Sequence, residues 1–206
     1  MGDSTADGQS APKEGLREVK RRQTRSRIID AGLRLFLEQG YEATTIDAIA
    51  EDARISRRSF YSYFKSKDDL LMAWQDGAWQ TIWEVLSRES PAQAPLEAVR
   101  RAFLSSAADY QSDTMLVIDR LMRSTESLHA RKQLAYADKE LELYAVLRTI
   151  WPGEERRVAL RLVAMVSIGA FRLALDDWSE DGGGQPFAGY VSRAFGAIAG
   201  ELPPLP

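Results

Sequence analysis

Cysteine is absent from this chain of 206 residues, and histidine occurs only once, as His129. Disulfides, iron–sulfur clusters and thiol catalysis are therefore excluded, and one histidine without cysteine cannot make a usual zinc site. The sequence also lacks a phosphate-cradling glycine loop and a recognisable nucleophile–base pair. We therefore expect no metal site, no other cofactor and no enzymatic activity.

Long apolar runs are missing as well. The longest uncharged, mainly apolar run covers residues 162–171, which is ten residues, whereas a transmembrane helix needs about 20. The start of the chain, MGDSTADGQSAPKEG, is polar and lacks the apolar stretch of a signal peptide. These absences predict a soluble, cytoplasmic protein that does not engage a membrane.

The chain has no excess of basic residues overall, and its basic residues are unevenly distributed. The net charge is −3, yet residues 17–67 hold twelve Lys/Arg against seven Asp/Glu and so carry +5. A basic N-terminal third on an acidic body is typical of a nucleic-acid contact confined to one end of a molecule. A chance scatter of surface charge is the alternative.

The hydrophobic pattern is helical from about residue 17 onward, and strand-type alternation is missing. We predict an all-α fold of about nine helices, with residues 1–16 as a disordered tail. Residues 17–67 are predicted to form a helix-turn-helix domain, with helices at 18–39, about 46–53 and 57–64. Residues 68–206 are predicted to form a ligand-binding and dimerisation domain, with helices at 68–88, 96–110, 114–124, 127–150, 154–178 and 187–200.

Local signals support the first helix boundaries. Gly40 is a plausible stop for the first helix. The pairs Thr44 with Asp47 and Ser66 with Asp69 have capping-box spacing and predict the starts of the second and fourth helices.

Two short helices joined by a tight turn at residues 54–56 have the layout of a helix-turn-helix unit. The second of these helices buries Phe60 and Phe64, which leaves its other face free for the major groove of DNA. That face carries side chains suited to bases and phosphates: Arg57, Arg58, Ser59, Tyr61, Ser62 and Tyr63. A helix whose polar side only faces water is the alternative.

The run from Thr24 to Leu71, TRSRIIDAGLRLFLEQGYEATTIDAIAEDARISRRSFYSYFKSKDDLL, resembles the DNA-binding domain of TetR-family transcriptional regulators. The matching positions are Ile29, Ala31, Leu35, Phe36, Gly40, Tyr41, Thr44, Thr45, Ile46, Ile49, Ala50, Ala53, Ile55, Ser56, Phe60, Tyr61, Tyr63, Phe64, Ser66, Lys67, Leu70 and Leu71. The resemblance covers 48 residues, and the length and helical remainder of the chain also suit the family.

The resemblance implies roles for individual residues. Thr45 would cap the second helix and present its hydroxyl and backbone N–H to a phosphate. Base reading would fall to Arg57, Arg58 and Tyr61, and backbone gripping to Ser59, Tyr63 and Lys67. The family usually has glycine in the turn where this chain has Arg54, which costs on the order of 1 kcal/mol if the turn is left-handed there.

The resemblance also implies a ligand-responsive regulator, more typically a repressor, that binds a pseudo-palindromic DNA operator as a homodimer. Half-sites would lie about 10 bp apart or somewhat more. The last helix is rich in small residues, which permit close helix approach, and we predict a dimer interface on the last two helices. An intramolecular core is the alternative there, and a helical small-molecule-binding protein without specific DNA binding is the alternative function.

Two further groups of residues leave more than one interpretation open. A basic cluster of Lys20, Arg21, Arg22, Arg25 and Arg27 indicates either an arm along the minor groove or a solvated helix start. The candidates for a small-molecule effector site are Trp83, Phe103, Tyr110, Met115, Asp119, Met122, Arg123, Tyr136, Ser167 and Phe171. Each aromatic or Met residue could instead belong to the core, and Arg123 could be ion-paired. A hydrophobic acid, an acyl thioester or an aromatic compound would suit such a site.

Overall fold

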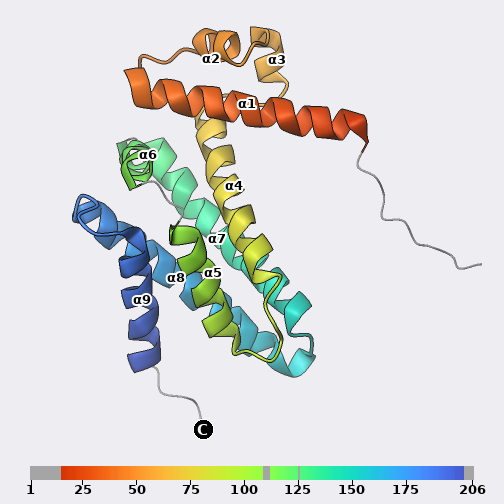
Figure 1. Ribbon diagram of the computed structural model, residues 1–206, viewed down its shortest axis with the longest axis vertical. Helices are drawn as coiled ribbons and strands as arrows, with labels where there is room; N and C mark the ends of the chain where they lie inside the picture. Colours follow the sequence, from red (N-terminus) through yellow and green to blue (C-terminus); the bar gives the residue numbers. More distant parts are fainter. Residues whose placement is uncertain (1–14, 109–111, 125, 202–206) are drawn as a thin grey trace, which may run out of the picture. The chain divides into compact units, whose positions relative to one another are not determined.

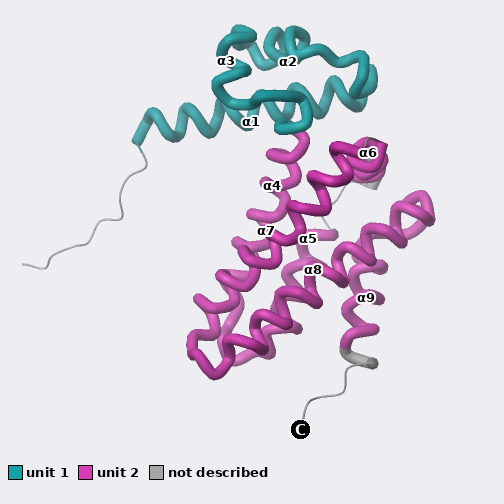
Figure 2. Tube along the Cα trace, turned by 180° about the vertical axis from the view of Figure 1, so that it is seen from behind, with its two compact units in different colours: residues 1–70 teal, residues 71–206 magenta. Residues whose placement is uncertain are grey.

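The structure is a computed structural model that describes residues 15–108, 112–124 and 126–201. Within these residues the chain forms nine α-helices, one short 3-10 helix and no strand, which confirms the all-α prediction (Figure 1). The chain divides into two compact units, residues 1–70 and residues 71–206 (Figure 2).

The first unit holds α1 (Leu16–Gln39), α2 (Ile46–Asp52), α3 (Arg57–Tyr61) and the first turn of α4 (Lys67–Leu86). Its core is closed by fully buried apolar side chains from all four helices: Ile28, Ile49, Phe60 and Leu70. A Cβ added to Gly32 would lie 2.6 Å from a methyl carbon of Leu70. Glycine at this position therefore lets α1 and the start of α4 pack closely.

Two helix ends in the first unit differ from the predictions. The predicted tail lies outside the described residues except for its last two positions, and Leu16 already belongs to α1. Helix α3 ends at Tyr61 rather than Phe64, because Ser62 is the C-cap and its Oγ donates to the carbonyl oxygen of Ser59 at 2.6 Å. The following residues continue in turns, which still bury Phe64 against Phe60.

The cap of α2 is Thr45, as the family resemblance implied, and not Thr44. The Thr45 hydroxyl accepts a hydrogen bond from the backbone N–H of Ala48 at 3.1 Å. The hydroxyl of Thr44 is buried and donates to the carbonyl oxygen of Gly40 at 2.7 Å. The capping-box prediction for Thr44 with Asp47 is therefore wrong by one residue. At α4 the Ser66 hydroxyl does accept from the N–H of Asp69 at 3.1 Å.

The second unit contains the rest of α4, followed by α5 (Pro95–Ala108), α6 (Ser112–Ser124), α7 (Glu126–Ile150), α8 (Arg157–Glu180) and α9 (Phe187–Glu201). The 3-10 helix η1 (Glu154–Arg156) precedes α8, so the predicted helix at 154–178 is two elements. The other helices of this unit start and end within two residues of their predicted positions.

Helix α8 is the central helix of the second unit and contacts α5, α6, α7 and α9. Trp178, Ala164 and Ile168 are fully buried in it. By length and composition α8 could cross a bilayer, although the longest uncharged run within this helix has ten residues. In this structure 44% of its apolar window is buried among the other helices.

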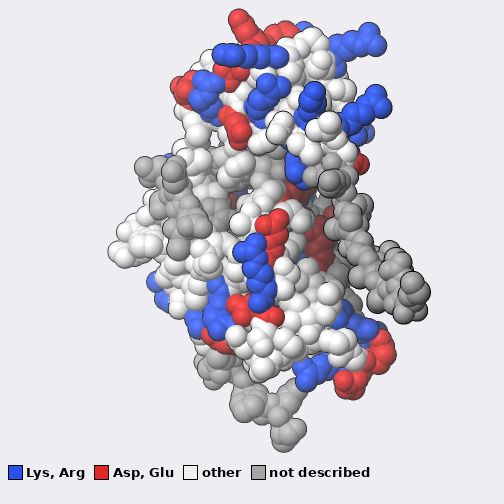
Figure 3. All heavy atoms as spheres, turned by 45° about the vertical axis from the view of Figure 1, so that its right-hand side comes forward, with Lys and Arg blue, Asp and Glu red and all other residues white. Residues whose placement is uncertain are grey.

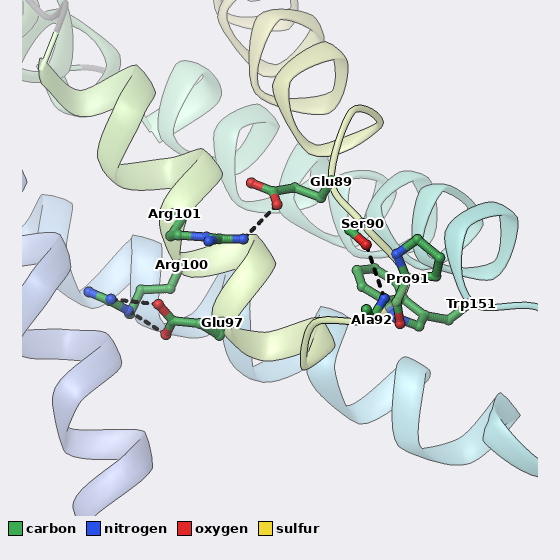
Figure 4. A network of polar contacts seen from close by, with 8 residues as sticks. All are labelled: Glu89, Ser90, Pro91, Ala92, Glu97, Arg100, Arg101 and Trp151. Carbon is green, nitrogen blue, oxygen red and sulfur yellow. Dashed lines mark hydrogen bonds and ion pairs between the residues drawn. The ribbon is translucent and has the colours of Figure 1, made fainter.

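Polar contacts fix the connection between α4 and α5 (Figure 4). The indole N–H of Trp151, just after α7, donates to the carbonyl oxygen of Pro91 at 2.9 Å. Arg101 of α5 reaches back to Glu89 at 2.6 Å, and Glu97 holds Arg100 by two hydrogen bonds of 2.7 and 2.8 Å. The contacts of Trp151 and Arg101 hold the segment that follows α4 against α5 and the end of α7.

Candidate DNA interface and ligand cavity

The turn between α2 and α3 requires a left-handed residue, and Arg54 provides it. Arg54 has φ of +55° and is the one non-glycine residue with positive φ in the described part of the chain. The N–H of Ile55 donates to the carbonyl oxygen of Ala50 at 2.9 Å and closes the turn. The expectation of a left-handed residue here is confirmed, and the Arg54 side chain is exposed.

Helix α3 is anchored by its apolar face and its N-cap. Phe60 is fully buried and Phe64 nearly so. Ser56 caps the helix by accepting from the N–H of Ser59 at 3.1 Å, and the two serine hydroxyls are 2.9 Å apart. The hydroxyls of Ser59 and Ser62 are therefore both engaged in bonds within the helix.

The exposed face of α3 presents two arginines and a tyrosine. Arg57 pairs with Asp47 of α2, with Nη1 and Oδ2 2.9 Å apart, and its guanidinium carbon lies 5.9 Å from the centre of the Tyr61 ring. Arg58 is exposed and Tyr61 is 45% exposed. Tyr63 follows the helix and is half-buried. Asp47 orients Arg57 across the two helices, a role that its sequence position did not reveal.

Lys67 lies at the first position of α4 and contacts the segment that leads into α2. Its Nζ donates to the carbonyl oxygens of Tyr41 at 2.6 Å and Thr44 at 2.9 Å, and it lies 4.2 Å from the centre of the Tyr41 ring. Two of the three N–H groups of the ammonium are therefore used within the protein, and one remains for a phosphate. Sequence reasoning predicted only the phosphate contact.

The basic cluster predicted near the N-terminus lies within α1. Lys20, Arg21, Arg25 and Arg27 are exposed along this helix, and Arg25 lies over the ring of Phe64 at 5.4 Å. Figure 3 shows Lys and Arg side chains gathered on the first unit. Of the two interpretations, the described residues favour a basic helix rather than an extended arm.

A separate cavity lies within the second unit, between α4, α6 and α8. Its volume is about 40 Å³, which is smaller than the usual range of ligand sites. It is lined by Leu71, Trp74, Gln75, Ala78, Trp79, Met115, Ile118, Asp119, Met122, Phe171 and Leu175. On α4 and α6 these positions recur at helical spacing, so each helix contributes one continuous stripe.

A buried ion pair forms one side of this cavity. Asp119 accepts from Lys132 Nζ at 2.5 Å through one carboxylate oxygen and from Arg123 Nε at 2.6 Å through the other. The side chains of Asp119 and Lys132 are only 2% and 4% exposed. Burial acts to raise the pKa of Asp119, but the two cations outweigh it and hold this pKa below its ordinary value.

The same cluster ties three helices together. Arg123 of α6 also reaches Asp176 of α8 at 2.5 Å, while Lys132 belongs to α7. Burial is the main cause that lowers the pKa of Lys132, although Asp119 partly opposes this shift. Asp119 is therefore both a wall of the cavity and the joint between α6 and α7.

The predicted effector residues fall into four groups. Met115, Asp119, Met122 and Phe171 line the cavity, and Arg123 binds Asp119. Trp83, Phe103, Tyr136 and Ser167 are buried in the surrounding core and do not line it. Tyr110 lies outside the described residues.

The α4 side of the cavity was absent from the predicted effector set. Leu71, Trp74, Gln75 and Ala78 were missed, although their spacing of three and four residues marks one face of a helix. Among the described residues, no group of three His, Asp or Glu side chains could hold a metal ion.

Comparisons with known proteins identify the first unit. Residues 28–73 match the sequence profile of the family described as bacterial regulatory proteins, tetR family. The regulator TcmR of Streptomyces glaucescens is 36% identical over 89 residues, which are 43% of this chain and 39% of TcmR. HbdR of Aromatoleum sp. is 34% identical over 119 residues, or 56% of this chain and 51% of HbdR. The chain thus spans about half or less of the length of these curated relatives.

Solved structures share the whole fold. FadR of Thermus thermophilus, a TetR-family repressor solved with lauroyl-CoA, has a TM-score of 0.57 at 19% identity and covers 88% of this chain and 98% of its own. The SmeT–triclosan complex has a TM-score of 0.58 at 20% identity, covering 89% and 99%. TcmR and HbdR are both HTH-type transcriptional regulators. Residues 28–73 are therefore similar to the tetR family of bacterial regulatory proteins, and the chain shares the fold of these solved structures.

Proposed function

We propose that the chain is a cytoplasmic, ligand-responsive transcriptional repressor that binds a pseudo-palindromic DNA operator as a homodimer. The observation that carries the proposal is the exposed face of α3. Arg57 is held in place by Asp47 beside the exposed Arg58 and Tyr61, while Phe60 anchors the helix from below. Such a face suits base edges in a major groove.

Contacts to the DNA backbone would surround this face. The N-terminus of α2, with its first N–H groups beside the Thr45 cap, suits a phosphate. The remaining N–H of Lys67 and the hydroxyl of Tyr63 suit two more phosphates. Ser59 and Ser62 are the weaker candidates, since their hydroxyls already bond within the helix and could only accept or share a bond.

A dimer interface on the last two helices is supported by an apolar stripe on α8. Its exposed members recur at helical spacing: Val158, Leu162, Met165 and Leu173. Gly169 lies within the stripe, and a Cβ added there would meet nothing within 4 Å. The same is true of Gly189 and Gly196 on α9. A second copy could therefore approach both helices closely, and burying the stripe would favour association.

Release from the operator would follow from the position of α4. This helix begins in the first unit and supplies five of the eleven cavity-lining residues in the second. An effector that binds better to one position of α4 would shift the DNA-binding helices with it. The resulting loss of operator affinity is expected to be about 1–3 kcal/mol.

Selection of the purified protein against random duplex DNA tests the proposal, followed by anisotropy at about 150 mM salt. A two-fold symmetric motif with half-sites about one helical turn or more apart is the expected result. Weak, salt-sensitive binding without an enriched motif would refute it. That outcome would favour the alternative, a helical small-molecule-binding protein without specific DNA binding.

A further inference from the structure

Asp47 is an acidic side chain beside the exposed face of α3. It lies in the first turn of α2 and its side chain is 64% exposed, and its carboxylate contacts Arg57, ten residues later in the chain. An exposed carboxylate on a DNA-binding face repels the phosphates of every sequence alike. Such a residue lowers the affinity for DNA unless it contributes something else to binding.

The contact with Arg57 indicates what Asp47 contributes. Arg57 Nη1 and Asp47 Oδ2 are 2.9 Å apart, and the guanidinium carbon of Arg57 lies 5.9 Å from the centre of the Tyr61 ring. Arg57 is therefore held by a carboxylate and an aromatic ring, although its side chain is 60% exposed. The contact with Asp47 uses Nη1, so the edge formed by Nε and Nη2 can still meet the two acceptors of a guanine.

Arg58, the next residue of α3, has no such restraint. Its side chain is exposed, and with the described residues it forms no ion pair. An unrestrained arginine loses conformational entropy when it binds a base, and it reaches phosphates of any sequence as readily as a base edge. The two neighbouring arginines therefore differ in how far their direction is set before DNA binds.

We propose that Asp47 is a specificity-determining residue that acts through Arg57. It holds the guanidinium for base edges and keeps it from the phosphates that every sequence shares. The cost is a lower affinity for DNA in general, and the gain is a larger difference in affinity between the operator and other sequences. This inference rests on the proposed function, in which Arg57 reads bases, and it names a second residue on which that reading depends.

Removal of the carboxylate should change binding to random DNA and to the operator differently. In Asp47→Ala the affinity for random duplex should rise, because a negative charge is lost and Arg57 is free to bind a phosphate in each protomer. The slope of log affinity against log salt on random duplex should steepen by about one per half-site. The ratio of operator affinity to random-duplex affinity should fall roughly tenfold, which two exposed ion pairs, one in each protomer, can supply.

Double variants assign this effect to Arg57. In an Arg57→Ala background, Asp47→Ala should change the operator-to-random ratio by less than about twofold, since the side chain through which Asp47 acts is gone. In an Arg58→Ala background the fall of roughly tenfold should persist. Glu51→Ala removes the same charge from an exposed position one turn further along α2, and it should leave the ratio unchanged. Thermal unfolding verifies that each variant folds.

Affinities of the full-length protein are measured by anisotropy at several salt concentrations, with the selected operator and with random duplex. Two results would overturn the inference: an operator-to-random ratio that is unchanged in Asp47→Ala, or a ratio that falls equally with and without Arg57. If selection on the parent yields no enriched motif, the proposed regulator is overturned instead. In that case a steeper salt slope in Asp47→Ala still supports the restraint of Arg57, and an unchanged slope overturns it as well.

Discussion

Because Asp119 and Lys132 form a buried ion pair, we expect the variant Asp119→Leu to lose much of its free energy of unfolding, by an amount that depends on pH. The substitution leaves a buried ammonium on Lys132, whose side chain is 4% exposed. Asp176, the other carboxylate that raises the pKa of Lys132, is already bound to Arg123 and is half exposed. Removing one partner of a buried pair typically lowers the free energy of unfolding by about 3–5 kcal/mol.

The loss of unfolding free energy in Asp119→Leu has an upper limit, because Lys132 can lose its proton instead of remaining charged and buried. Deprotonating a lysine of ordinary pKa near 10.4 at pH 7 costs about 4.6 kcal/mol, since one pKa unit is worth about 1.36 kcal/mol. The penalty in Asp119→Leu should therefore lie at about 3–4.6 kcal/mol. In the double variant Asp119→Leu with Lys132→Met both charges are gone, and stability should return to within about 1–2 kcal/mol of the parent.

The direction in which the pKa of Lys132 shifts determines whether the free energy of unfolding rises or falls with pH. In Asp119→Leu this pKa falls further below its unfolded value, so the unfolded chain binds more protons than the folded one. The free energy of unfolding should then rise with pH between about 7 and 10, by at most about 1.36 kcal/mol per pH unit. In the parent, the lowered pKa of Asp119 contributes stability above the unfolded pKa of about 3.9, which is lost as the pH falls through the folded pKa.

Urea unfolding followed by tryptophan fluorescence is the suitable assay, because all five tryptophans lie in the second unit. Midpoints and slopes are compared for the parent, the single variant and the double variant at pH 7, 8 and 9. A penalty below about 1 kcal/mol in Asp119→Leu, or a double variant no more stable than the single one, would refute the reasoning about the buried charge.

Four other predictions concern the DNA-binding unit and the dimer. Arg54→Gly should raise the melting temperature by about 2–4 °C, because relief of the left-handed φ of +55° outweighs the entropy of the added glycine; calorimetry that shows no increase would contradict the strain. Leu162→Glu should give monomers in analytical ultracentrifugation, whereas Leu37→Glu, an exposed site on α1, should remain dimeric. Arg57→Ala should weaken operator binding by about 1–3 kcal/mol for each base pair that Arg57 reads, and should relax the base preference at that position. Lys67→Ala should weaken binding to all DNA sequences and lower the slope of log affinity against log salt by roughly one per half-site. Equal, sequence-independent losses of affinity in Arg57→Ala and Lys67→Ala would contradict the division into base-reading and phosphate-binding roles.

The elements of this fold were predictable because local signals mark them. Apolar residues at helical spacing and stops such as Gly40 predict the helices, and the structure has them within a few residues. Local geometry was predictable where a residue type conflicts with its position: Arg54 stands where the family usually has glycine, and its φ is positive. The start of α2 was missed by one residue, since Thr44 has capping-box spacing but its hydroxyl donates to the carbonyl oxygen of Gly40 instead.

The contacts of the DNA-binding unit show why residue roles were harder to predict than elements. The motif predicts a basic side chain at Lys67, but not that its ammonium binds the carbonyl oxygens of Tyr41 and Thr44, 26 and 23 residues away. A charged group near DNA can contact a phosphate, brace its own domain or do both. Only the distances between helices distinguish these roles.

The cavity was the least predictable part, because core and cavity residues share the same chemistry and spacing. Trp79 and Trp83 are one helical turn apart, nearly equally buried and stacked on each other, yet only Trp79 lines the cavity. The difference arises from where α6 and α8 meet α4, which no local pattern records.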